Sequence, residues 1–560
     1  MNIGVPAGVN ADVQARVNAA FDRIEDADRS EVWISLRSRD EVVREALEID
    51  PSLPFAGLVF AVKDNIDVAG LPTTAAAASY TYQPIADATA VQRLRQAGAI
   101  VVGKTNLDQF ATGLVGTRSP FGAVRNAWDP MRISGGSSSG SAVAVALGLV
   151  DFALGTDTAG SGRVPAALNG IVGIKPTKGL VPVTGVVPAC YTLDCVTVFA
   201  RDLALGRSVA EMMEGADSAD PLSRTAQPTA AAPARPRIAV PTAEHLEGLA
   251  SGWKEAFAAA VVRFASIGAE IVEIDIEPLL EAASLLYDGA FVAERYAAVG
   301  AHIDKHPELV GTDLDPTVAS IVLGGKEKSA ADWALDAARL AALGSAGRRA
   351  LEGCVALLTP TTTWHPTLAE VAADPVGANA RMGRYTNFAN LLDQASLAVP
   401  AGLVAGLPFG VMLTGPAFTD RTLAEVAARF ANPGIDLFVV GAHLTGQPLN
   451  VQLATVGGTL VASTATAPSY ALHALDTCPP KPGLVWVSEG GNSIKGEVWR
   501  LPANGFGAFV DTVPAPMVIG RVTLIDGSSV SGFLVEPAAL KSAPDISHLG
   551  GWLNYLASAP

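Results

Sequence analysis

Two clusters of serine and glycine could support nucleophilic chemistry. They are "GGSSSGS" at 135–141 and "TAGSG" at 158–162, and an apolar stretch of helical length separates them. Gly136–Gly140 matches the G-x-S-x-G pattern of a nucleophile elbow, which requires a histidine base and an acidic partner. None of the seven histidines stands in a context that identifies it as that base. The sequence gives a histidine-dependent hydrolase little support, so another base has to be found.

Lys63 is the candidate for this base. It follows the apolar run Leu58–Val62 in "GLVFAVKDN", where a solvated lysine is unexpected. The pKa of a free lysine is about 10.4, so burial must lower it strongly before the amine can accept a proton near neutral pH. The alternative from the residues alone is a lysine at a strand end that points to solvent.

A third pattern, "GAIVVGKT" at Gly98–Thr105, matches a phosphate-binding loop. That function requires the four intervening residues to form a loop that wraps phosphates. Here they are Ala-Ile-Val-Val, which is typical of a strand. We therefore expect a strand and no nucleotide site.

Several motifs taken together resemble the amidase signature family. They are "VKDNIDVAG", "GKTNLDQFA", "GGSSSGSAVAVALG", "LGTDTAGSGRVPAALNGIVGIKPT", "LLTPTTT" and "LAVPAGL", in the family's order over residues 50–415. The resemblance implies an α/β fold with a mixed, mostly parallel central sheet covered by helices. It also implies hydrolysis or transfer of amide groups, with no cofactor and no metal.

The resemblance assigns roles to individual residues. Lys63 matches the general base, Ser137 the bridging serine after a cis peptide bond, and Ser161 the nucleophile. In such a relay Ser161 gives its proton to Ser137, and Ser137 gives one to Lys63. The backbone N–H groups of Thr158, Ala159, Gly160 and Ser161 match the oxyanion hole.

The neighbouring polar residues have simpler explanations. We expect Ser138, Ser139 and Ser141 to satisfy turn and helix-cap hydrogen bonds. We expect Asp157 and Arg163 to form a structural pair beside the nucleophile.

Two segments are similar to the allophanate hydrolase branch of this family. "DTAGSGRVPAA" has Ala159 and Gly162 where many relatives have glycine and a bulky aliphatic residue, and "LLYDGAFVAERYAAV" covers 285–299. Allophanate is an anion, and arginine is suited to bind its carboxylate through two parallel hydrogen bonds. Tyr287 and Arg295 match the carboxylate-binding positions. They are about two helical turns apart, so we expect them to share one helix face; a surface arginine and a core tyrosine are the alternative.

The chain divides into two expected domains. Residues 1–432 form the amidase domain, with helical patterns in 11–48, 243–302 and 329–352 and a Pro/Ala-rich connector near 214–237. Short β-type runs between turns, among them "VQLATVGGTLVAST" at 451–464, predict a β-rich domain at 436–560, which resembles a γ-glutamyl cyclotransferase-like fold. The resemblance implies that this domain assists decarboxylation of the N-carboxycarbamate product. "FVVGAHLTG" places His443 at that fold's ligand loop, and a turn histidine is the alternative.

Composition excludes several classes of function. The 560 residues carry a formal net charge of −16, which argues against nucleic acid as a partner. The four cysteines are too few for a disulfide framework, no secretory signal is visible, and the apolar runs are too short to span a membrane. We therefore expect a cytoplasmic protein. The family resemblance implies a role in urea or s-triazine catabolism and a homodimer. The chain has no biotin or ATP signature, so a biotin-dependent urea carboxylase would be a separate polypeptide.

Two other functions remain open. One is a different amidase, including the glutaminase subunit of a tRNA-dependent amidotransferase, which the acidic charge and the second domain disfavour. The other is a non-catalytic binding protein, which would not need Lys63, Ser137 and Ser161 together.

Overall fold

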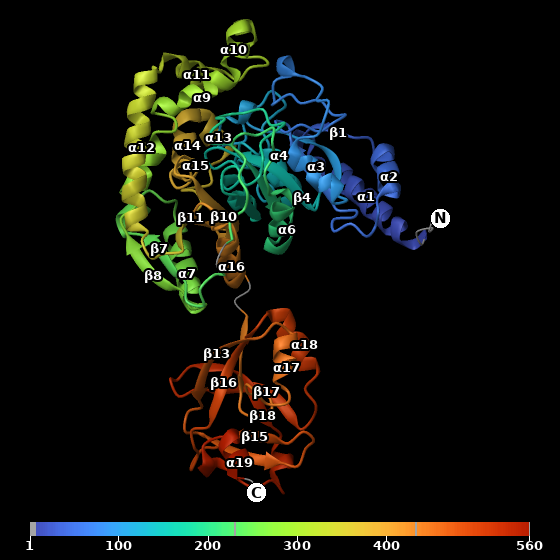
Figure 1. The fold of residues 1–560 in the computed structure, drawn as a ribbon, viewed down its shortest axis with the longest axis vertical. Coiled ribbons are helices and arrows are strands. Elements are labelled where there is room, and N and C mark those ends of the chain that lie inside the picture. The colour runs from blue at the N-terminus through green and yellow to red at the C-terminus, as the bar shows by residue number, and fades with distance from the viewer. Residues whose placement is uncertain (1–6, 229–230, 432–433, 559–560) are drawn as a thin grey trace. The chain divides into compact units, whose positions relative to one another are not determined.

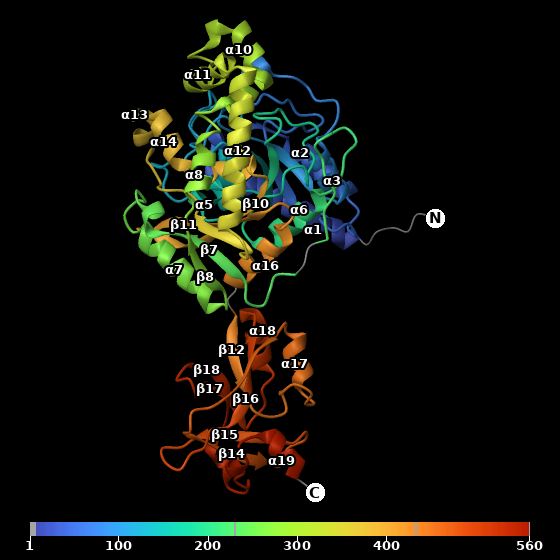
Figure 2. The ribbon, with the colours of Figure 1, turned by 60° about the vertical axis from the view of Figure 1, so that its left-hand side comes forward.

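The computed structural model describes residues 7–228, 231–431 and 434–558. The chain forms two compact units, Met1–Ala431 and Asn432–Pro560 (Figures 1 and 2). The first domain was expected to end at residue 432, which lies outside the described residues.

The first unit is built on one large sheet. Its strands are β1 (Trp33–Leu36), β2 (Val59–Lys63), β3 (Ile100–Thr105), β4 (Phe152–Asp157), β5 (Val172–Lys175), β6 (Cys195–Ala200), β7 (Arg237–Pro241), β8 (Glu270–Ile274), β9 (Ala356–Pro360), β10 (Gln394–Val404) and β11 (Leu407–Pro416). They hydrogen-bond in the order β1-β3-β2-β4-β6-β5-β10-β11-β9-β7-β8. The expected mixed sheet is therefore confirmed.

Parallel pairing does not predominate, contrary to expectation. Among the described residues the parallel pairs are β2–β3, β2–β4, β7–β8 and β7–β9. The other six neighbouring pairs are antiparallel. One reason is visible in the sequence "VAGL": Ala405 and Gly406, with φ of 49° and 80°, form a two-residue turn that joins β10 to β11 as a hairpin.

Helices surround this sheet (Figures 1 and 2). They are α1 (Ala7–Ala27), α2 (Arg39–Glu48), α3 (Thr89–Gln96), α4 (Ser139–Ala146), α5 (Val164–Asn169), α6 (Leu203–Met213), α7 (Trp253–Ser266), α8 (Glu277–Ser284), α9 (Ala293–Arg295), α10 (Ala301–Lys305), α11 (Pro316–Gly324), α12 (Ala330–Ala350), α13 (Leu368–Ala373), α14 (Pro375–Met382), α15 (Asn387–Leu391) and α16 (Asp420–Ala431). The expectation of helix throughout 11–48 was wrong, because Trp33–Leu36 forms β1 and pairs with β3. Four residues are too few to show a period that separates strand from helix.

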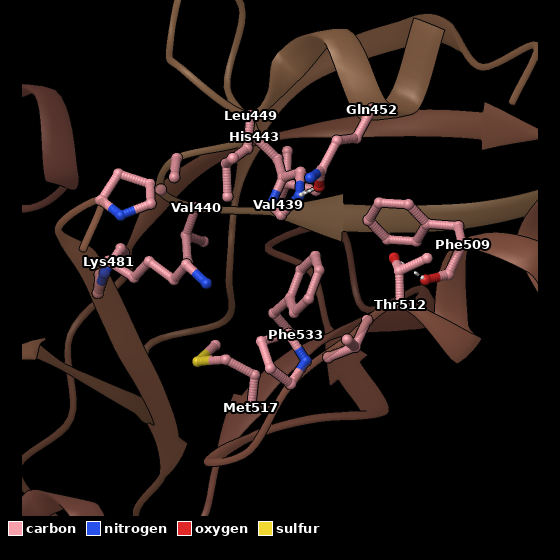
Figure 3. A pocket seen from close by; sticks show the side chains of 16 residues that line it. Val439, Val440, His443, Leu449, Gln452, Lys481, Phe509, Thr512, Met517 and Phe533 are labelled. Carbon is pink, nitrogen blue, oxygen red and sulfur yellow. Dashed lines mark hydrogen bonds between the residues drawn. The ribbon is translucent and has the colours of Figure 1, made fainter. Parts of the chain in front are cut away.

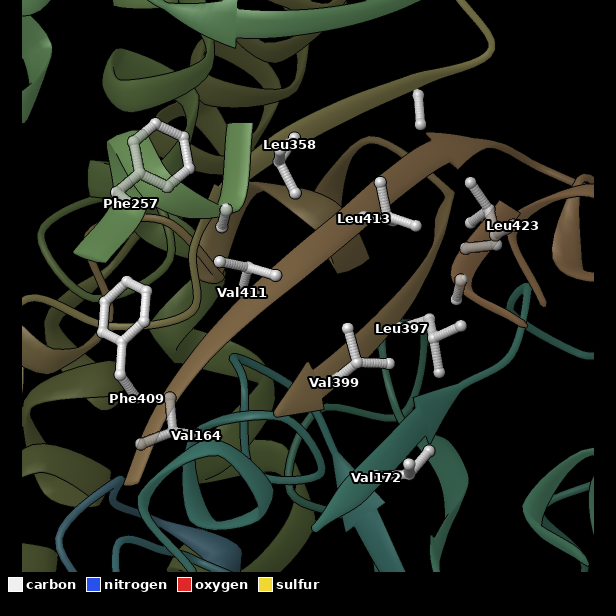
Figure 4. Packing of buried hydrophobic residues seen from close by; sticks show 14 of the residues in the cluster. Val164, Val172, Phe257, Leu358, Leu397, Val399, Phe409, Val411, Leu413 and Leu423 are labelled. Carbon is white, nitrogen blue, oxygen red and sulfur yellow. The ribbon is translucent and has the colours of Figure 1, made fainter. Parts of the chain in front are cut away.

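The β10–β11 hairpin lies in the largest hydrophobic core (Figure 4). Leu397 pairs with Leu413 and Val399 with Val411, so the apolar residues of both strands alternate in register. Phe257 of α7 and other buried side chains pack against them. The long antiparallel pair thus joins the two ends of the sheet into one rigid layer.

The second unit has its own sheets and its own core. Its strands are β12 (Ile435–Val439), β13 (Thr459–Ala465), β14 (Tyr470–Leu475), β15 (Lys481–Trp486), β16 (Lys495–Leu501), β17 (Met517–Thr523) and β18 (Ser529–Val535). Five form the sheet β13-β16-β12-β18-β17, and β14 pairs with β15. The helices are α17 (Asn450–Thr455), α18 (Ala503–Asp511) and α19 (Trp552–Ser558). A separate β-rich domain is confirmed, but "VQLAT" at 451–455 is helical where a β-type run was expected.

Candidate active site

The sheet brings the segments that carry Lys63 and Ser161 to one edge. Lys63 is the last residue of β2, and β4 runs parallel to β2 with Val62 opposite Leu154. The carboxyl ends of both strands therefore lie together, and β4 continues directly into the segment that carries Ser161. Such an edge is where α/β sheets place their functional residues.

Lys63 is buried rather than solvated. Its side chain has no exposed surface, and its Nζ donates to Ser137 Oγ at 2.8 Å and to Thr156 Oγ1 at 2.7 Å. Burial lowers the pKa of the ammonium to about 7. A substantial fraction of the amine is therefore neutral near neutral pH and able to accept a proton.

Three carboxylates limit this fall in the pKa of Lys63. Asp108, Asp194 and Asp157 raise it, and the Arg295 guanidinium lowers it. None of the three is in ion-pair contact with Lys63 among the described residues. The effect of burial exceeds that of the three carboxylates, so the pKa of Lys63 falls, as expected for a lysine that acts as a base near neutral pH.

Ser137 is held in place by its backbone. The Gly136–Ser137 peptide bond is cis, as the family resemblance implies. The Ser137 carbonyl oxygen accepts a hydrogen bond from the Asp108 N–H at 3.0 Å. A Cβ on Gly136 would lie 2.1 Å from Asp108 Oδ2, so only glycine fits there.

Ser161 lies in a tight turn after β4. It is 2% exposed, and its Oγ is 3.4 Å from the Gly113 carbonyl oxygen. Within the described residues no hydrogen bond joins Ser161 Oγ to Ser137 or Lys63. The structure thus brings Lys63 and Ser137 into contact and leaves Ser161 Oγ directed to another acceptor.

The segment Thr158–Ser161 has free backbone donors. Its four N–H groups make no hydrogen bond to any described part of the chain. Gly160 has a φ of 142°, and a Cβ there would lie 2.3 Å from Thr386 Oγ1. With its amide oriented to satisfy its neighbours, Asn387 donates to the Ala159 carbonyl oxygen at 2.8 Å. N–H groups with no partner in a buried turn are suited to bind an oxyanion.

The neighbouring pair and serines are structural. Asp157 and Arg163 are fully buried and form an ion pair of 2.8 Å, and Asp157 also accepts the Gly162 N–H. The three serines do not cap α4, contrary to expectation, because helix α4 has no side-chain cap. Their hydroxyls instead donate to carbonyl groups of adjoining strands and loops: Ser138 to Thr156, Ser139 to Asn106 and Ser141 to Leu154.

Tyr287 and Arg295 meet, but not on one helix face. Helix α8 ends at Ser284, and Gly289 interrupts the helical path with an extended backbone before α9 begins. The chain folds back so that Arg295 Nη2 donates to Tyr287 OH at 3.2 Å. Arg295 is 1% exposed, so its guanidinium is held inside the unit.

Sequence reasoning missed Thr156, Asn65 and Asp194. Thr156 Oγ1 accepts from Lys63 and, at 3.3 Å, from Asn65. Asp194 accepts from the Thr158 hydroxyl, and burial raises the pKa of its carboxyl to about 6. Thr156 carried one signal, a polar residue near the end of the apolar strand β4. Asp194 carried none, because its contact depends on a distant loop.

His443 lies in a separate cavity of the second unit, of about 250 Å³ (Figure 3). Its ring stacks on Phe533 at 5.0 Å between centroids, and its Nε2 is 3.0 Å from Gln452 Oε1. Burial lowers the pKa of the imidazole. Lys481 lines the same cavity and lowers that pKa further, so a cationic side chain and a neutral histidine face one space.

Two other kinds of site are absent from the described ranges. No group of three or more His, Cys, Asp or Glu residues there could hold a metal ion. No helix in those ranges is long and apolar enough to cross a membrane. Within "GAIVVGKT", Ile100–Thr105 form the expected strand β3, and Lys104 pairs with Asp64 at 3.0 Å.

The chain matches two protein families. Residues 15–424 match the amidase family, and residues 435–557 match the allophanate hydrolase C-terminal domain. The urea amidolyase of Saccharomyces cerevisiae is 43% identical over 93% of this chain, which spans only 31% of that protein. The chain thus spans about a third of the length of the urea amidolyases it matches.

Solved structures and shorter relatives agree with these matches. The selenomethionine-substituted allophanate hydrolase of Kluyveromyces lactis is 39% identical, with a TM-score of 0.71, and the match covers 97% of both chains. One subunit of the glutamyl-tRNA(Gln) amidotransferase of Thermus thermophilus is 35% identical over 71% of this chain and 88% of its own length. The first unit, its buried lysine and serine contact, and these similarities lead to one conclusion. This chain belongs to the amidase family.

Proposed function

We propose that this enzyme hydrolyses allophanate and releases ammonia. The observation that carries the proposal is the contact between Lys63 Nζ and Ser137 Oγ in a fully buried site where the lysine pKa is about 7. The match of the second unit to the allophanate hydrolase C-terminal domain supports this substrate over a general amide.

The proposed chemistry is a serine–serine–lysine relay. Neutral Lys63 accepts a proton from Ser137, and Ser137 accepts one from Ser161 as Ser161 Oγ attacks the amide carbon of allophanate. This step requires Ser161 Oγ to leave the Gly113 carbonyl oxygen and turn toward Ser137, and χ1 is the torsion angle about which a serine hydroxyl oxygen moves. The backbone N–H groups of Thr158–Ser161 bind the oxygen as it gains negative charge.

The second half of the reaction reverses the proton path. Protonated Lys63 returns a proton through Ser137 to the leaving nitrogen, and ammonia departs from the acyl-enzyme. Water then attacks the acyl carbon, loses its proton to the same relay, and frees Ser161 with N-carboxycarbamate as product.

Arg295 and Tyr287 are the proposed binding site for the substrate carboxylate. The guanidinium of Arg295 donates to Tyr287 OH and Thr112 Oγ1, which orients it. Its Nε has no hydrogen-bond partner among the described residues. A buried cation with unused donors is suited to an anionic ligand.

The second unit is proposed to assist decarboxylation. N-carboxycarbamate loses carbon dioxide to give carbamate, and the proton that replaces the lost carboxylate must come from an acid or from water. Lys481 could bind a carboxylate in the cavity that His443 lines, and His443 could donate or accept a bond there.

The wider biological setting stays an expectation from the family resemblance. It comprises a cytoplasmic homodimer that receives allophanate from a separate biotin-dependent urea carboxylase, or through s-triazine degradation. The net charge of −16 accords with a protein that does not bind nucleic acid.

One assay tests the substrate. Ammonia release is measured from fresh allophanate, biuret, malonamide and glutamine at equal concentrations. The proposal expects the highest kcat/KM for allophanate and the loss of that activity in Ser161→Ala. A preference for glutamine would instead assign the chain to the glutaminase subunits of amidotransferases.

A further inference from the structure

Two buried arginines flank Thr112 beside the nucleophile segment. Arg118 is 2% exposed and Arg295 is 1% exposed. Arg118 Nη1 donates to the Thr112 carbonyl oxygen at 3.1 Å, and Arg295 Nη1 donates to Thr112 Oγ1 at 2.9 Å. The next residue, Gly113, accepts the Ser161 hydroxyl. Both guanidinium groups therefore bind Thr112, the residue directly before Gly113, and Gly113 is in contact with Ser161.

Both arginines keep unused hydrogen-bonding capacity. A guanidinium has five N–H donors. Arg118 uses one more of them on the Pro375 carbonyl oxygen at 2.6 Å, and Arg295 uses one on Tyr287 OH. The Nε of each has no partner among the described residues, and no ion pair joins either side chain to a described carboxylate.

The nearby carboxylates are already engaged. Asp108 accepts the backbone N–H groups of Val115, Gly116 and Arg118, and burial raises its pKa although Arg118 opposes this rise. Asp194 is occupied by Thr158 and two backbone N–H groups. Neither carboxylate offers Arg118 or Arg295 a direct contact, and buried cations without a counter-ion are costly.

The backbone that places Thr112 is strained. Phe110 and Ala111 have φ values of 49° and 53°, a region that residues other than glycine rarely adopt. Strain of this kind persists where the surrounding structure holds it and is concentrated at ligand sites. Here it sets Thr112 between the two guanidinium groups.

A cavity lies beside this group of residues and reaches Arg118. It has a volume of about 660 Å³, and Arg118, Tyr287 and Asn387 all line it. Tyr287 contacts Arg295, and Asn387 contacts the Ala159 carbonyl group of the nucleophile segment. A small ligand in this cavity can therefore reach Arg118 directly, and it is one contact away from Arg295 and from the Ala159 carbonyl group.

We propose that Arg118 is a second anion-binding residue of this site and that, with Arg295, it favours small ligands that carry two negative charges. The inference rests on the proposed function. Allophanate carries one negative charge, whereas its tetrahedral intermediate and the N-carboxycarbamate product carry two. A second fixed cation therefore stabilises the states formed during the reaction more than the substrate.

The test measures equilibrium binding by calorimetry in the full chain carrying Ser161→Ala, which prevents turnover. Malonate, malonamate and malonamide provide two, one and no negative charges on the same short skeleton. Arg118→Met is expected to weaken malonate binding by roughly 10–100-fold, as loss of a charged hydrogen bond does. Malonamate binding falls less, and malonamide binding stays unchanged.

Arg381→Met is the matched control. Arg381 lines the same cavity and donates to the Gly248 carbonyl oxygen, but it is exposed and stacks on Trp364. Its loss is expected to change malonate binding by less than about fivefold. Equal weakening of all three ligands by Arg118→Met, or unchanged malonate binding, overturns the inference.

Two further measurements keep the outcome decisive. If Arg118→Met does not fold, the ionic-strength dependence of binding to the unsubstituted site replaces it, and malonate must show a steeper dependence than malonamate. Arg118-dependent malonate binding without allophanate turnover in the wild-type chain contradicts the proposed function alone. If the wild-type chain turns over allophanate but malonate binding does not depend on Arg118, this inference is wrong and the proposed function stands.

Discussion

Thr156 Oγ1 accepts a hydrogen bond from Lys63 Nζ at 2.7 Å, while the same amine is 2.8 Å from Ser137 Oγ. A neutral amine has two N–H donors and one lone pair. When Thr156 takes one N–H, the lone pair can turn to Ser137, which is the orientation that proton acceptance requires.

This contact predicts the effect of Thr156→Val. The substitution keeps the shape of the side chain and removes the acceptor, so kcat should fall roughly 10–100-fold as a buried donor loses its partner. KM for allophanate should change little, because the role inferred for Thr156 is to orient the Lys63 amine. Thr156→Ser keeps the hydroxyl and should retain most of the activity. A larger loss in Thr156→Ser than in Thr156→Val would contradict this positioning role.

Activity should rise with pH through about 7. Lys63 must be neutral to accept a proton, and burial lowers its pKa to about 7 from 10.5. The kcat/KM profile for an uncharged amide should therefore increase to a plateau above that value. A profile that falls over the same range would exclude Lys63 as the base.

The same lowered pKa predicts a dependence of stability on pH. Between about 7 and 10.5 the unfolded chain binds a proton at Lys63 and the folded chain does not, so this residue makes stability rise with pH in that window. Lys63→Met should remove this slope and raise the Tm at pH 7, while kcat falls at least roughly a thousandfold. Thermal unfolding at several pH values checks it, with Lys305→Met as an exposed lysine for comparison.

Gly160 should tolerate no side chain. Its φ is 142° and a Cβ would meet Thr386 Oγ1 at 2.3 Å, so Gly160→Ala should destabilise the fold by roughly 1–3 kcal/mol and move the oxyanion donors. We expect a lower Tm together with a large loss of kcat. Gly507→Ala is the control, because it lies within α18 of the second unit with open space around its Cβ. Full activity in Gly160→Ala would show that these N–H groups do not bind the oxyanion.

Arg295→Lys should affect charged and uncharged substrates differently. Lysine keeps the charge but cannot form two parallel bonds to a carboxylate. KM for allophanate should rise about tenfold or more, as loss of a charged hydrogen bond implies, while KM for malonamide changes little. Equal changes for both substrates would remove Arg295 from carboxylate recognition.

His443→Ala should separate the two halves of the reaction. In the proposed mechanism the first ammonia is released in the first unit, so it should appear at the wild-type rate. If the cavity of the second unit assists decarboxylation, carbon dioxide release should lag behind it. Simultaneous measurement of ammonia and carbon dioxide checks this, and Lys481→Met should produce the same lag. Coincident release in both variants would leave the domain without a chemical role.

The sequence by itself determined the family, the α/β character of the first unit and the β-rich second domain. The family follows from the order of its motifs. The two domains follow from apolar runs between turns and from the change to short β-type runs near residue 433. All of these are features of the local sequence. It also identified Lys63 as a candidate base, because the five apolar residues before it indicate a buried position that would lower its pKa.

Only the tertiary structure decided the contacts of the site. Lys63, Ser137 and Thr156 meet because β2 and β4 are parallel neighbours, and sequence periodicity does not specify which strands pair. The hydrogen bond from Arg295 to Thr112 joins residues that are 183 positions apart. The helix expected to carry both Tyr287 and Arg295 is interrupted at Gly289. This interruption also depends on how the chain packs. Burial and pKa are properties of these long-range contacts, so they appear only when the chain is folded.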